Sequence, residues 1–551
     1  MKRVWGSLSP VGVLVGGILL ALSLTPSLLP RPAVLQGVGS GLVFGLGYAV
    51  GAGASALVAW VTRRRPSQAL GRRLRIIAWS VLAVVVVLAA IGGVAAQNEV
   101  RRMVELAPLD SVNVVGFVVA LTLTTLVCLA VGRLVRVGWL RAQRTMVSKG
   151  RSPGRARRLA TGRAVLAIAV TLALLAGVGY VLLDRIYYGT NAYPTDDLTA
   201  PASTYRSAGA GSAVSFDQLG RHGGNFLTQG PTAEKISEAT GKPALTPVRV
   251  YVGIAAGGTL ADRTATAVRE LERTGGFDRE VLVVATTTGS GWLEPQAVDA
   301  VEYLHSGNTA IVALQYAYTP SFVTAATDPT LPAETTSALF TAVRAKWLTL
   351  PEGHRPKLVV YGLSLGSQGV MNAFGSLDAL LTRTDGALLV GPTNSAPLWR
   401  GLQSNRDAGS PPWQPVHDKG ERLRWASGFG DFEKLTGPWA SPRVAILQHA
   451  TDPITWLGPE LIWQSPEWLA EGNRAPDVSP AMRWIPVVTA LQVGIDMMVA
   501  EDVPARHGHA FGDVMLQGWQ AVTGDGGLDQ AALGRIQKVI ESYAVISPAQ
   551  V

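Results

Sequence analysis

The sequence predicts an α-helical transmembrane region followed by an α/β domain with a mostly parallel sheet. Three observations carry this prediction. The first third of the 551 residues holds five long apolar stretches, basic residues concentrate between those stretches, and the remaining residues alternate short apolar strands with amphipathic helices. Hydrophobic residues make up 48% of the chain, which is typical of a protein that lies partly in a membrane.

The apolar stretches are each long enough to cross a bilayer, which takes about 20 residues. The first follows Lys2 and Arg3, as a signal peptide would, but it lacks a small-x-small cleavage site and leads through prolines into the next stretch. We therefore predict a five-span region over residues 1–184, with spans near 10–29, 34–61, 76–96, 112–135 and 164–184.

The charges between the spans predict their orientation. Residues 62–75 contain six arginines and no acidic residue, and residues 133–163 contain ten basic residues and no acidic one, whereas residues 97–111 mix both signs. Because basic loops stay in the cytoplasm, we expect a plasma-membrane protein with a cytoplasmic N-terminus and an extracytoplasmic chain after residue 184. The same loops explain the net charge of +9, so we expect the lipid bilayer and not nucleic acid as a partner.

Small residues and cysteine usage add two expectations. Gly37, Gly41 and Gly45 recur at the spacing that lets helices approach closely in lipid, although a glycine-rich helix without that role fits the pattern equally well. Cys128 is the only cysteine and lies in an apolar stretch, and the histidines lack zinc-binding spacing. We expect no disulfide, no metal and no cofactor.

The part of the chain after the spans is predicted to begin with a linker or flap over residues 185–247, which are rich in small residues and proline. An α/β domain follows over residues 248–551, because near-continuous apolar strands alternate with helices as in a parallel sheet. Strands are expected at 248–254, 281–285, 309–316, 358–361, 386–390 and 444–448, and helices at 263–273, 296–305, 333–348 and 368–377.

Two insertions rich in tryptophan and proline, at about 393–441 and 455–500, interrupt this alternation. Their tryptophans could form a lid that receives a lipid substrate, or they could fill a second layer of a large core. The sequence is compatible with both interpretations.

The strand at 358–361 ends in the sequence GLSLG at 362–366, and a helical pattern follows. This is Gly-x-Ser-x-Gly in a strand–turn–helix setting, the arrangement of a nucleophile elbow. The glycines let strand and helix pass closely, and the turn lifts the serine hydroxyl clear of the backbone. The motif by itself is weak and a merely tight turn is the alternative, but its place at a strand end makes Ser364 the candidate nucleophile.

A serine nucleophile needs a base that a carboxylate orients, in the chain order Ser, acid, His. Asp452 follows the expected strand at 444–448 at the same sheet edge as Ser364, although it could also be a cap before Pro453. His509 lies in a late turn-like loop that leads into a helix near residue 514, and we prefer it to His507 as the base.

The oxyanion hole should use the backbone N–H of Leu365 and one N–H from the loop after the strand at 281–285. That loop reads TTTGSGW from residue 286, and Thr287 or Thr288 is the expected donor.

These features together resemble a family of bacterial membrane-anchored alpha/beta-hydrolases, with a multi-span N-terminal region and a C-terminal alpha/beta-hydrolase domain. The resemblance rests on VYVG at 250–253, RELERTGGFD at 269–278, GW at 291–292, YLH at 303–305, GLSLG at 362–366, QHATDP at 448–453, DVSPAMRW at 477–484 and HGH at 507–509. It implies a serine-hydrolase fold with Ser364, Asp452 and His509 or His507 as the triad. The chain departs from the general plan at residues 482–500, which look helical where a last strand is usual.

The expected activity is therefore that of a serine esterase or lipase-type enzyme acting on acyl esters of lipids or of the cell envelope. Two alternatives remain open on the sequence. The same acyl-enzyme could pass its acyl group to an alcohol, or the fold could serve as a non-catalytic membrane scaffold or transport accessory. Substrate identity and oligomeric state lie beyond the sequence.

Overall fold

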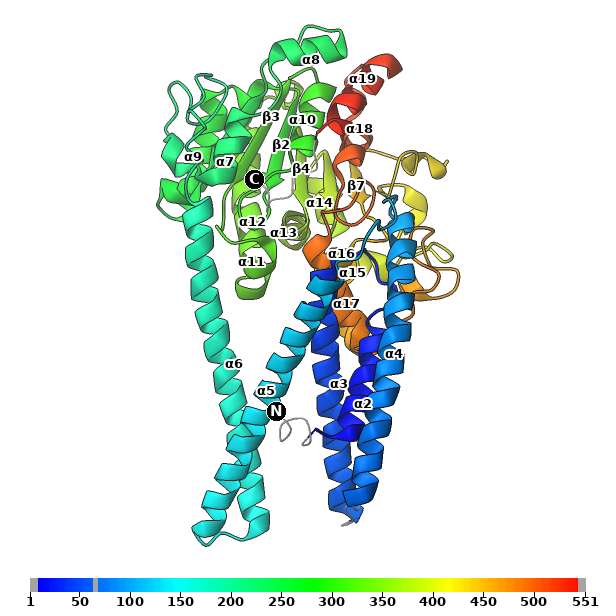
Figure 1. Ribbon diagram of the computed structural model, residues 1–551. Helices are drawn as coiled ribbons and strands as arrows, with labels where there is room; N and C mark the ends of the chain where they lie inside the picture. Colours follow the sequence, from blue (N-terminus) through cyan, green and yellow to red (C-terminus); the bar gives the residue numbers. More distant parts are fainter. Residues whose placement is uncertain (1–7, 63–67, 544–551) are drawn as a thin grey trace. The chain divides into compact units, whose positions relative to one another are not determined.

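The computed structural model describes residues 8–62 and 68–543, and its chain divides into two compact units (Figure 1). Unit 1 holds the residues up to Leu182 together with Pro459–Leu469 and Pro476–Val499, and unit 2 holds the rest. Lys2, Arg3 and residues 63–67, which include three arginines of the first predicted basic loop, lie outside the described residues.

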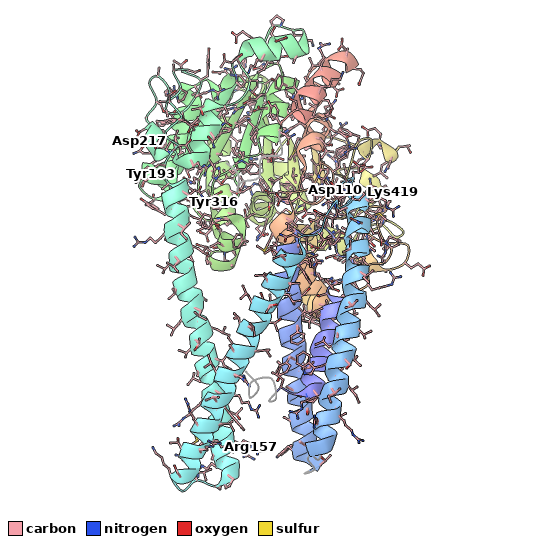
Figure 2. The ribbon with its side chains drawn as sticks, in the orientation of Figure 1. Asp110, Arg157, Tyr193, Asp217, Tyr316 and Lys419 are labelled. Carbon is pink, nitrogen blue, oxygen red and sulfur yellow. The ribbon has the colours of Figure 1, made fainter. Side chains whose placement is uncertain are left out.

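Unit 1 is built on helices α2 (Pro10–Leu22), α3 (Ala33–Thr62), α4 (Gln68–Met103), α5 (Val114–Ser148) and most of α6 (Pro153–Asn191), whose residues from Leu183 on belong to unit 2. Among the described residues, four helices, α3 to α6, are long and apolar enough to cross a membrane. The first predicted span corresponds to α2, whose 13 residues reach about 20 Å, less than the ~30 Å of a bilayer core. The count of five spans therefore stays a prediction. Asp110 lies just after α4, and Arg157 lies near the start of α6 (Figure 2).

The glycines of α3 lie where this helix packs against its neighbours α2 and α5. A Cβ atom at Gly41 would come within 2.7 Å of the Cβ of Thr124, and one at Gly45 within 2.6 Å of the Cβ of Cys128. Gly37 meets α5 in the same way. Of the two interpretations of this spacing, the structure therefore shows the close helix packing.

The second tryptophan-rich insertion contributes a helix, α17 (Val488–Asp496), to unit 1, where it packs on α3. A buried ion pair holds it, with Arg31 Nε 2.7 Å from Asp496 Oδ1. The other carboxylate oxygen accepts the Ser27 hydroxyl and, at 3.1 Å, the N–H of Leu28. Gln492 Nε2 donates to the carbonyl of Ser23 at 3.2 Å. Residues 476–499 are thus joined to the connection between α2 and α3.

Unit 2 contains a seven-stranded sheet in which every neighbouring pair of strands is parallel, as predicted. Its side chains are almost all buried on both faces, as the apolar strand sequences require. The order β1-β3-β2-β4-β5-β7-β6 places β4 in the centre, so its carboxyl end opens at the middle of the sheet edge. The strands are β1 (Val248–Val252), β2 (Val281–Thr286), β3 (Thr309–Leu314), β4 (Lys357–Leu363), β5 (Gly386–Val390), β6 (Leu423–Ala426) and β7 (Arg443–Leu447).

Two groups of helices cover the sheet. Helices α9 (Leu260–Arg273) and α12 (Leu331–Thr349) pack together and on β3, and α10 (Pro295–Leu304) and α18 (Met515–Thr523) pack together, with α18 on β5 and β7. Helix α13 (Leu365–Phe374) follows β4 and packs on α12 (Figure 1). The remaining helices are α7 (Gly220–Thr228), α8 (Ala233–Thr240), α11 (Ser321–Thr327), α14 (Leu377–Arg383), α15 (Pro397–Ser404), α16 (Pro453–Trp456) and α19 (Gln530–Glu541).

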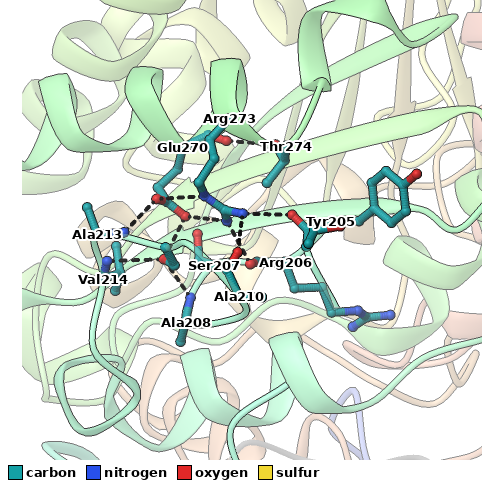
Figure 3. A network of polar contacts seen from close by, with 12 residues as sticks. Tyr205, Arg206, Ser207, Ala208, Ala210, Ala213, Val214, Glu270, Arg273 and Thr274 are labelled. Carbon is teal, nitrogen blue, oxygen red and sulfur yellow. Dashed lines mark hydrogen bonds and ion pairs between the residues drawn. The ribbon is translucent and has the colours of Figure 1, made fainter. Parts of the chain in front are cut away.

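The segment before β1 is fixed to α9 by a polar network (Figure 3). Arg273 donates to the backbone carbonyls of Thr204 and Arg206 at 2.8 Å each. Glu270, almost fully buried, accepts the Ser212 hydroxyl at 2.8 Å and the N–H of Ala213 at 3.0 Å. The ion pair between Arg273 and Glu270 on α9 therefore holds residues 204–213 against this helix.

Candidate active site

Ser364 occupies the sharp turn between β4 and α13. Its backbone has φ 56° and ψ −120°, in the region that favours glycine, and its N–H donates to the carbonyl of Val390 at 2.8 Å. A Cβ at Gly362 would lie 2.5 Å from the Gly366 carbonyl, and one at Gly366 would lie 2.4 Å from the carbonyl of Thr286. The Gly-x-Ser-x-Gly spacing thus has a steric cause, since both outer positions lack room for any side chain.

Asp452 follows β7 and is fully buried. Its Oδ2 lies 2.7 Å from Nδ1 of His509, which donates the hydrogen bond in the Nδ1–H tautomer. Its Oδ1 accepts the N–H of Ile454 at 2.9 Å, which caps the short helix α16. Asp452 therefore combines the two roles considered for it: one carboxylate oxygen binds His509, and the other caps a helix. Thr455 adds a longer bond of 3.3 Å to Oδ2.

His509 is buried, and its Nε2 has no hydrogen-bond partner in the part of the chain that the structure describes. The N–H of His509 donates to the carbonyl of Ala500 at 2.6 Å. The structure brings His509, and not His507, to the Asp452 carboxylate. His449 stacks on Phe511 with ring centroids 4.0 Å apart, and its Nδ1 lies 3.0 Å from the Gly508 carbonyl.

Ser364 and His509 each contact a residue at the end of β5. The carbonyl that accepts the Ser364 N–H belongs to Val390, and the next residue is Gly391. A Cβ on Gly391 would lie 2.5 Å from Cε1 of His509, so the imidazole rests against this glycine. Ser364 and the Cε1–Nδ1 edge of His509 therefore lie against two consecutive residues at the end of β5.

Most of the chain matches two models of one family. Residues 248–536 match the family described as "Alpha/beta-hydrolase family", and residues 24–231 match its companion described as "Alpha/beta-hydrolase family N-terminus". The chain belongs to this alpha/beta-hydrolase family. No curated protein and no solved structure matches the chain.

In this alpha/beta-hydrolase domain, the three predicted oxyanion donors differ in their backbone contacts. Leu365 is the first residue of α13, where backbone N–H groups have no helical acceptor. The N–H of Thr288 is bound to the carbonyl of Trp292 at 2.9 Å, so it is not free to stabilise an oxyanion. Thr287 directly follows β2, and its carbonyl accepts the hydroxyl of Tyr316 (Figure 2) at 2.9 Å. This hydrogen bond holds the Thr287–Thr288 peptide, the one that follows the peptide with the Thr287 N–H.

The electrostatic surroundings of His509 are strongly acidic. Burial alone would lower the pKa of His509, but the Asp452 carboxylate, followed by Glu501 and Glu294, leaves this pKa above its ordinary value of 6.5. Burial and the neighbouring Glu501 raise the pKa of Glu294 to about 8. Glu294 keeps partial solvent contact through a cavity of about 310 Å³ that His509, Glu294 and Glu501 line.

Sequence analysis did not identify Glu294, Glu501 or Gly391 as residues of the candidate site. Glu294 lies just before α10 in the loop that follows β2, and this position was the one available signal. Among the described residues, no group of three histidine, cysteine or acidic side chains is placed to hold a metal ion.

The tryptophans of the two insertions divide between the two interpretations. Trp399, Trp425, Trp456 and Trp468 are buried, and Trp399 donates to Oε1 of Gln448 at 2.8 Å. These four fill the core, as the second interpretation expects. Trp463 is the clear exception, with 64% of its surface exposed.

Proposed function

We propose that this protein is a membrane-anchored serine hydrolase that cleaves acyl esters through an acyl-enzyme on Ser364. The observation that carries the proposal is the 2.7 Å contact between His509 and the buried Asp452, which leaves Nε2 of His509 without a hydrogen-bond partner among the described residues. Asp452 fixes the tautomer in which Nε2 can accept a proton, which is the role of the acid in a Ser-His-Asp triad.

The reaction follows from these positions. The Ser364 hydroxyl attacks the ester carbonyl while Nε2 of His509 takes its proton, and the N–H groups of Leu365 and Thr287 stabilise the oxyanion. When the tetrahedral intermediate collapses, the imidazolium returns the proton to the leaving alcohol and an acyl-serine remains. Water, activated by the same nitrogen, then releases the acid and restores the serine.

The membrane region suggests a lipid or cell-envelope ester as the substrate, reached from the bilayer. The basic loops at residues 62–75 and 133–163 orient the chain whether or not α2 crosses the membrane. In both cases α6 leads outward, so the hydrolase domain lies outside the plasma membrane. Protease added to intact spheroplasts should therefore digest residues 192–543, and full protection would contradict this orientation.

Labelling of the full-length protein with a fluorophosphonate probe tests the activity. Wild type should label, Ser364→Ala should not, and His509→Ala should label at least ~100-fold more slowly because the serine loses its base. Ser404→Ala, an exposed serine on α15, is the matched control and should label like wild type. A folded wild type that does not label, or a Ser364→Ala variant that does, would refute the proposal.

A further inference from the structure

Residues 484–500, in the second tryptophan-rich insertion, are apolar although they lie outside the predicted spans. They contain a single charged residue, Asp496, which is buried in the ion pair with Arg31. Helix α17 and the turn Met497–Val499 that follows it form one short apolar helix. Their 9 and 3 residues together reach ~18 Å, too little to cross the ~30 Å of a bilayer core. An apolar helix of this length lies either in a protein core or at a membrane surface.

The contacts of α17 show which of its ends is directed toward the membrane helices. Asp496 binds the connection between α2 and α3 through Arg31 and the Ser27 hydroxyl. One turn earlier, Gln492 donates to the carbonyl of Ser23, the residue directly after α2, at 3.2 Å. The contacts therefore approach the membrane helices as α17 is followed back to its start.

These contacts lie at the outer ends of α3 and α4. Both helices have their opposite ends at the basic loop of residues 62–75, which stays in the cytoplasm. The Ser479 hydroxyl donates to Oε1 of Glu99, near the end of α4, at 2.5 Å. Helix α17 rests on the second turn of α3, where a Cβ at Gly39 would lie 2.4 Å from Cδ1 of Ile495 (Figure 1). The segment is therefore level with the outer lipid interface.

Exposed apolar side chains surround the start of α17. Ile462 and Trp463 lie there, because the N–H of Val487 donates to the carbonyl of Ile462 at 3.0 Å. Their exposed fractions are 42% and 64%, and Pro486 is exposed as well. A protein core would cover such side chains, and contact with water is unfavourable for them, whereas lipid accepts them.

Trp463 resembles two tryptophans of the membrane helices in its exposure. Among the described residues, the exposed tryptophans are Trp60 on α3, Trp79 on α4 and Trp463. Tryptophan favours the membrane interface, where its ring contacts lipid and its N–H can reach water. Gln464 and Glu467, both exposed, follow Trp463 closely, so this surface suits the interface rather than the hydrocarbon core.

We propose that Ile462, Trp463 and Pro486 form a lipid-binding surface that enters the outer leaflet of the membrane. The partner is the bilayer itself, because these residues belong to the same unit as α3 and α4, the helices whose exposed apolar side chains face lipid. The insertion between the proposed acid and the proposed base thus gives the protein a second contact with the bilayer. The inference rests on the proposed membrane orientation and not on the esterase activity.

Spin labelling of the full-length protein in phosphatidylcholine nanodiscs tests this surface. Cys128 is the only cysteine, so Trp463→Cys and Ile462→Cys can be labelled one at a time in a Cys128→Ala background. Collisions of the label with oxygen, which concentrates in lipid, are compared with collisions with a neutral nickel chelate, which stays in water. Both labels should favour oxygen and lie about 5–10 Å into the boundary between head groups and acyl chains, as interfacial segments do.

Two exposed positions calibrate the measurement. Val50→Cys, on α3, should favour oxygen more strongly, and Leu245→Cys, in unit 2, should favour the nickel chelate. Labels at Trp463→Cys and Ile462→Cys that behave like the one at Leu245→Cys would overturn the proposal. Protection from both reagents would overturn it as well, in favour of a protein partner or a second copy of this chain. Because the replaced side chains are exposed, the variants should fold, which unchanged melting temperatures would verify.

Fluorophosphonate labelling separates this inference from the proposed activity. A protein that reacts at Ser364 while its Trp463→Cys spin label contacts water would keep the esterase and lose the lipid surface. A lipid-immersed spin label in a protein that never reacts at Ser364 would support the surface and refute the esterase. Immersion together with full protection of residues 192–543 from protease would contradict the outer leaflet.

Discussion

Gly391 has no side chain, and this leaves room for the imidazole of His509. Because a Cβ would lie 2.5 Å from Cε1 of His509 and 2.8 Å from Cε2 of Phe511, Gly391→Ala must displace one of the two rings. Its φ of 50° adds backbone strain. We expect fluorophosphonate labelling of Ser364 to slow by about 10- to 100-fold, since small displacements of a base have such effects.

Gly401→Ala is the matched control for this change. Gly401 lies inside α15, and a Cβ there would meet nothing within 4 Å. This variant should label at the wild-type rate and be slightly more stable than wild type, because alanine has a higher helix propensity than glycine. Equal labelling rates for Gly391→Ala and Gly401→Ala would show that the ring position does not depend on Gly391.

The acidic residues around His509 predict how the rate of fluorophosphonate labelling at Ser364 depends on pH. His509 must be neutral to accept a proton, and its pKa lies above 6.5, so labelling should fall at a pH above 6.5 as the solution is acidified. Glu501 contributes to this raised pKa. Glu501→Gln should therefore move the acid limb to lower pH, whereas Glu433→Gln, an exposed control, should not. A rate profile in which Glu501→Gln moves the limb upward would contradict this account.

Sequence patterns predict those candidate site residues whose environment is local. Ser364 is marked by two glycines at fixed spacing, and Asp452 by its place after an apolar strand. Gly391 and Glu294 could not be found this way, because their roles depend on contacts with residues more than 100 positions away. The same is true of the choice between His507 and His509, which depends on which ring reaches Asp452.

Among the elements, strands were predictable where their sequences are continuously apolar. The strand that the sequence did not reveal, β6, carries Arg424 in its middle and lies in the first insertion. Its guanidinium is accommodated by backbone carbonyls, including those of Phe432 at 2.7 Å and Gly437 at 2.6 Å. A buried arginine held by distant carbonyls leaves no trace in an apolar pattern, so β6 becomes visible only in the folded chain.

Helix α3 offers a prediction at the same scale. Gly41 faces α5 at a distance that admits no side chain, whereas a Cβ at Gly53 would meet nothing within 4 Å. Gly41→Leu should force α3 away from α5 and lower the stability in detergent by about 1–3 kcal/mol or more, as overpacking does. Gly53→Leu is the control and should leave the melting temperature within a degree or two of wild type. Equal melting temperatures for the two variants would show that this contact does not stabilise the bundle.

Over the whole molecule, the chain order does not follow the division into two units. Residues 476–499, which lie between Asp452 and His509 in the sequence, belong to the unit of the membrane helices. The buried Arg31–Asp496 ion pair joins them to the connection between α2 and α3, 465 positions earlier in the chain. The segment that leads to His509, the proposed base, is therefore held by contacts with the connection between the N-terminal helices, which gives this region a structural role in addition to anchoring.

This arrangement predicts what the loss of one charge does. Arg31→Met leaves the carboxylate of Asp496 buried without its partner, so stability should fall by about 3–5 kcal/mol and residues 476–499 should become sensitive to protease. The double variant Arg31→Met/Asp496→Leu removes both charges and should recover most of that loss, whereas Arg400→Met, on the surface of α15, should cost little. Because the segment continues into the chain that carries His509, labelling of Ser364 should slow in Arg31→Met and recover in the double variant. A single variant as stable as wild type, or a double variant no better than the single one, would mean that the ion pair does not hold this segment.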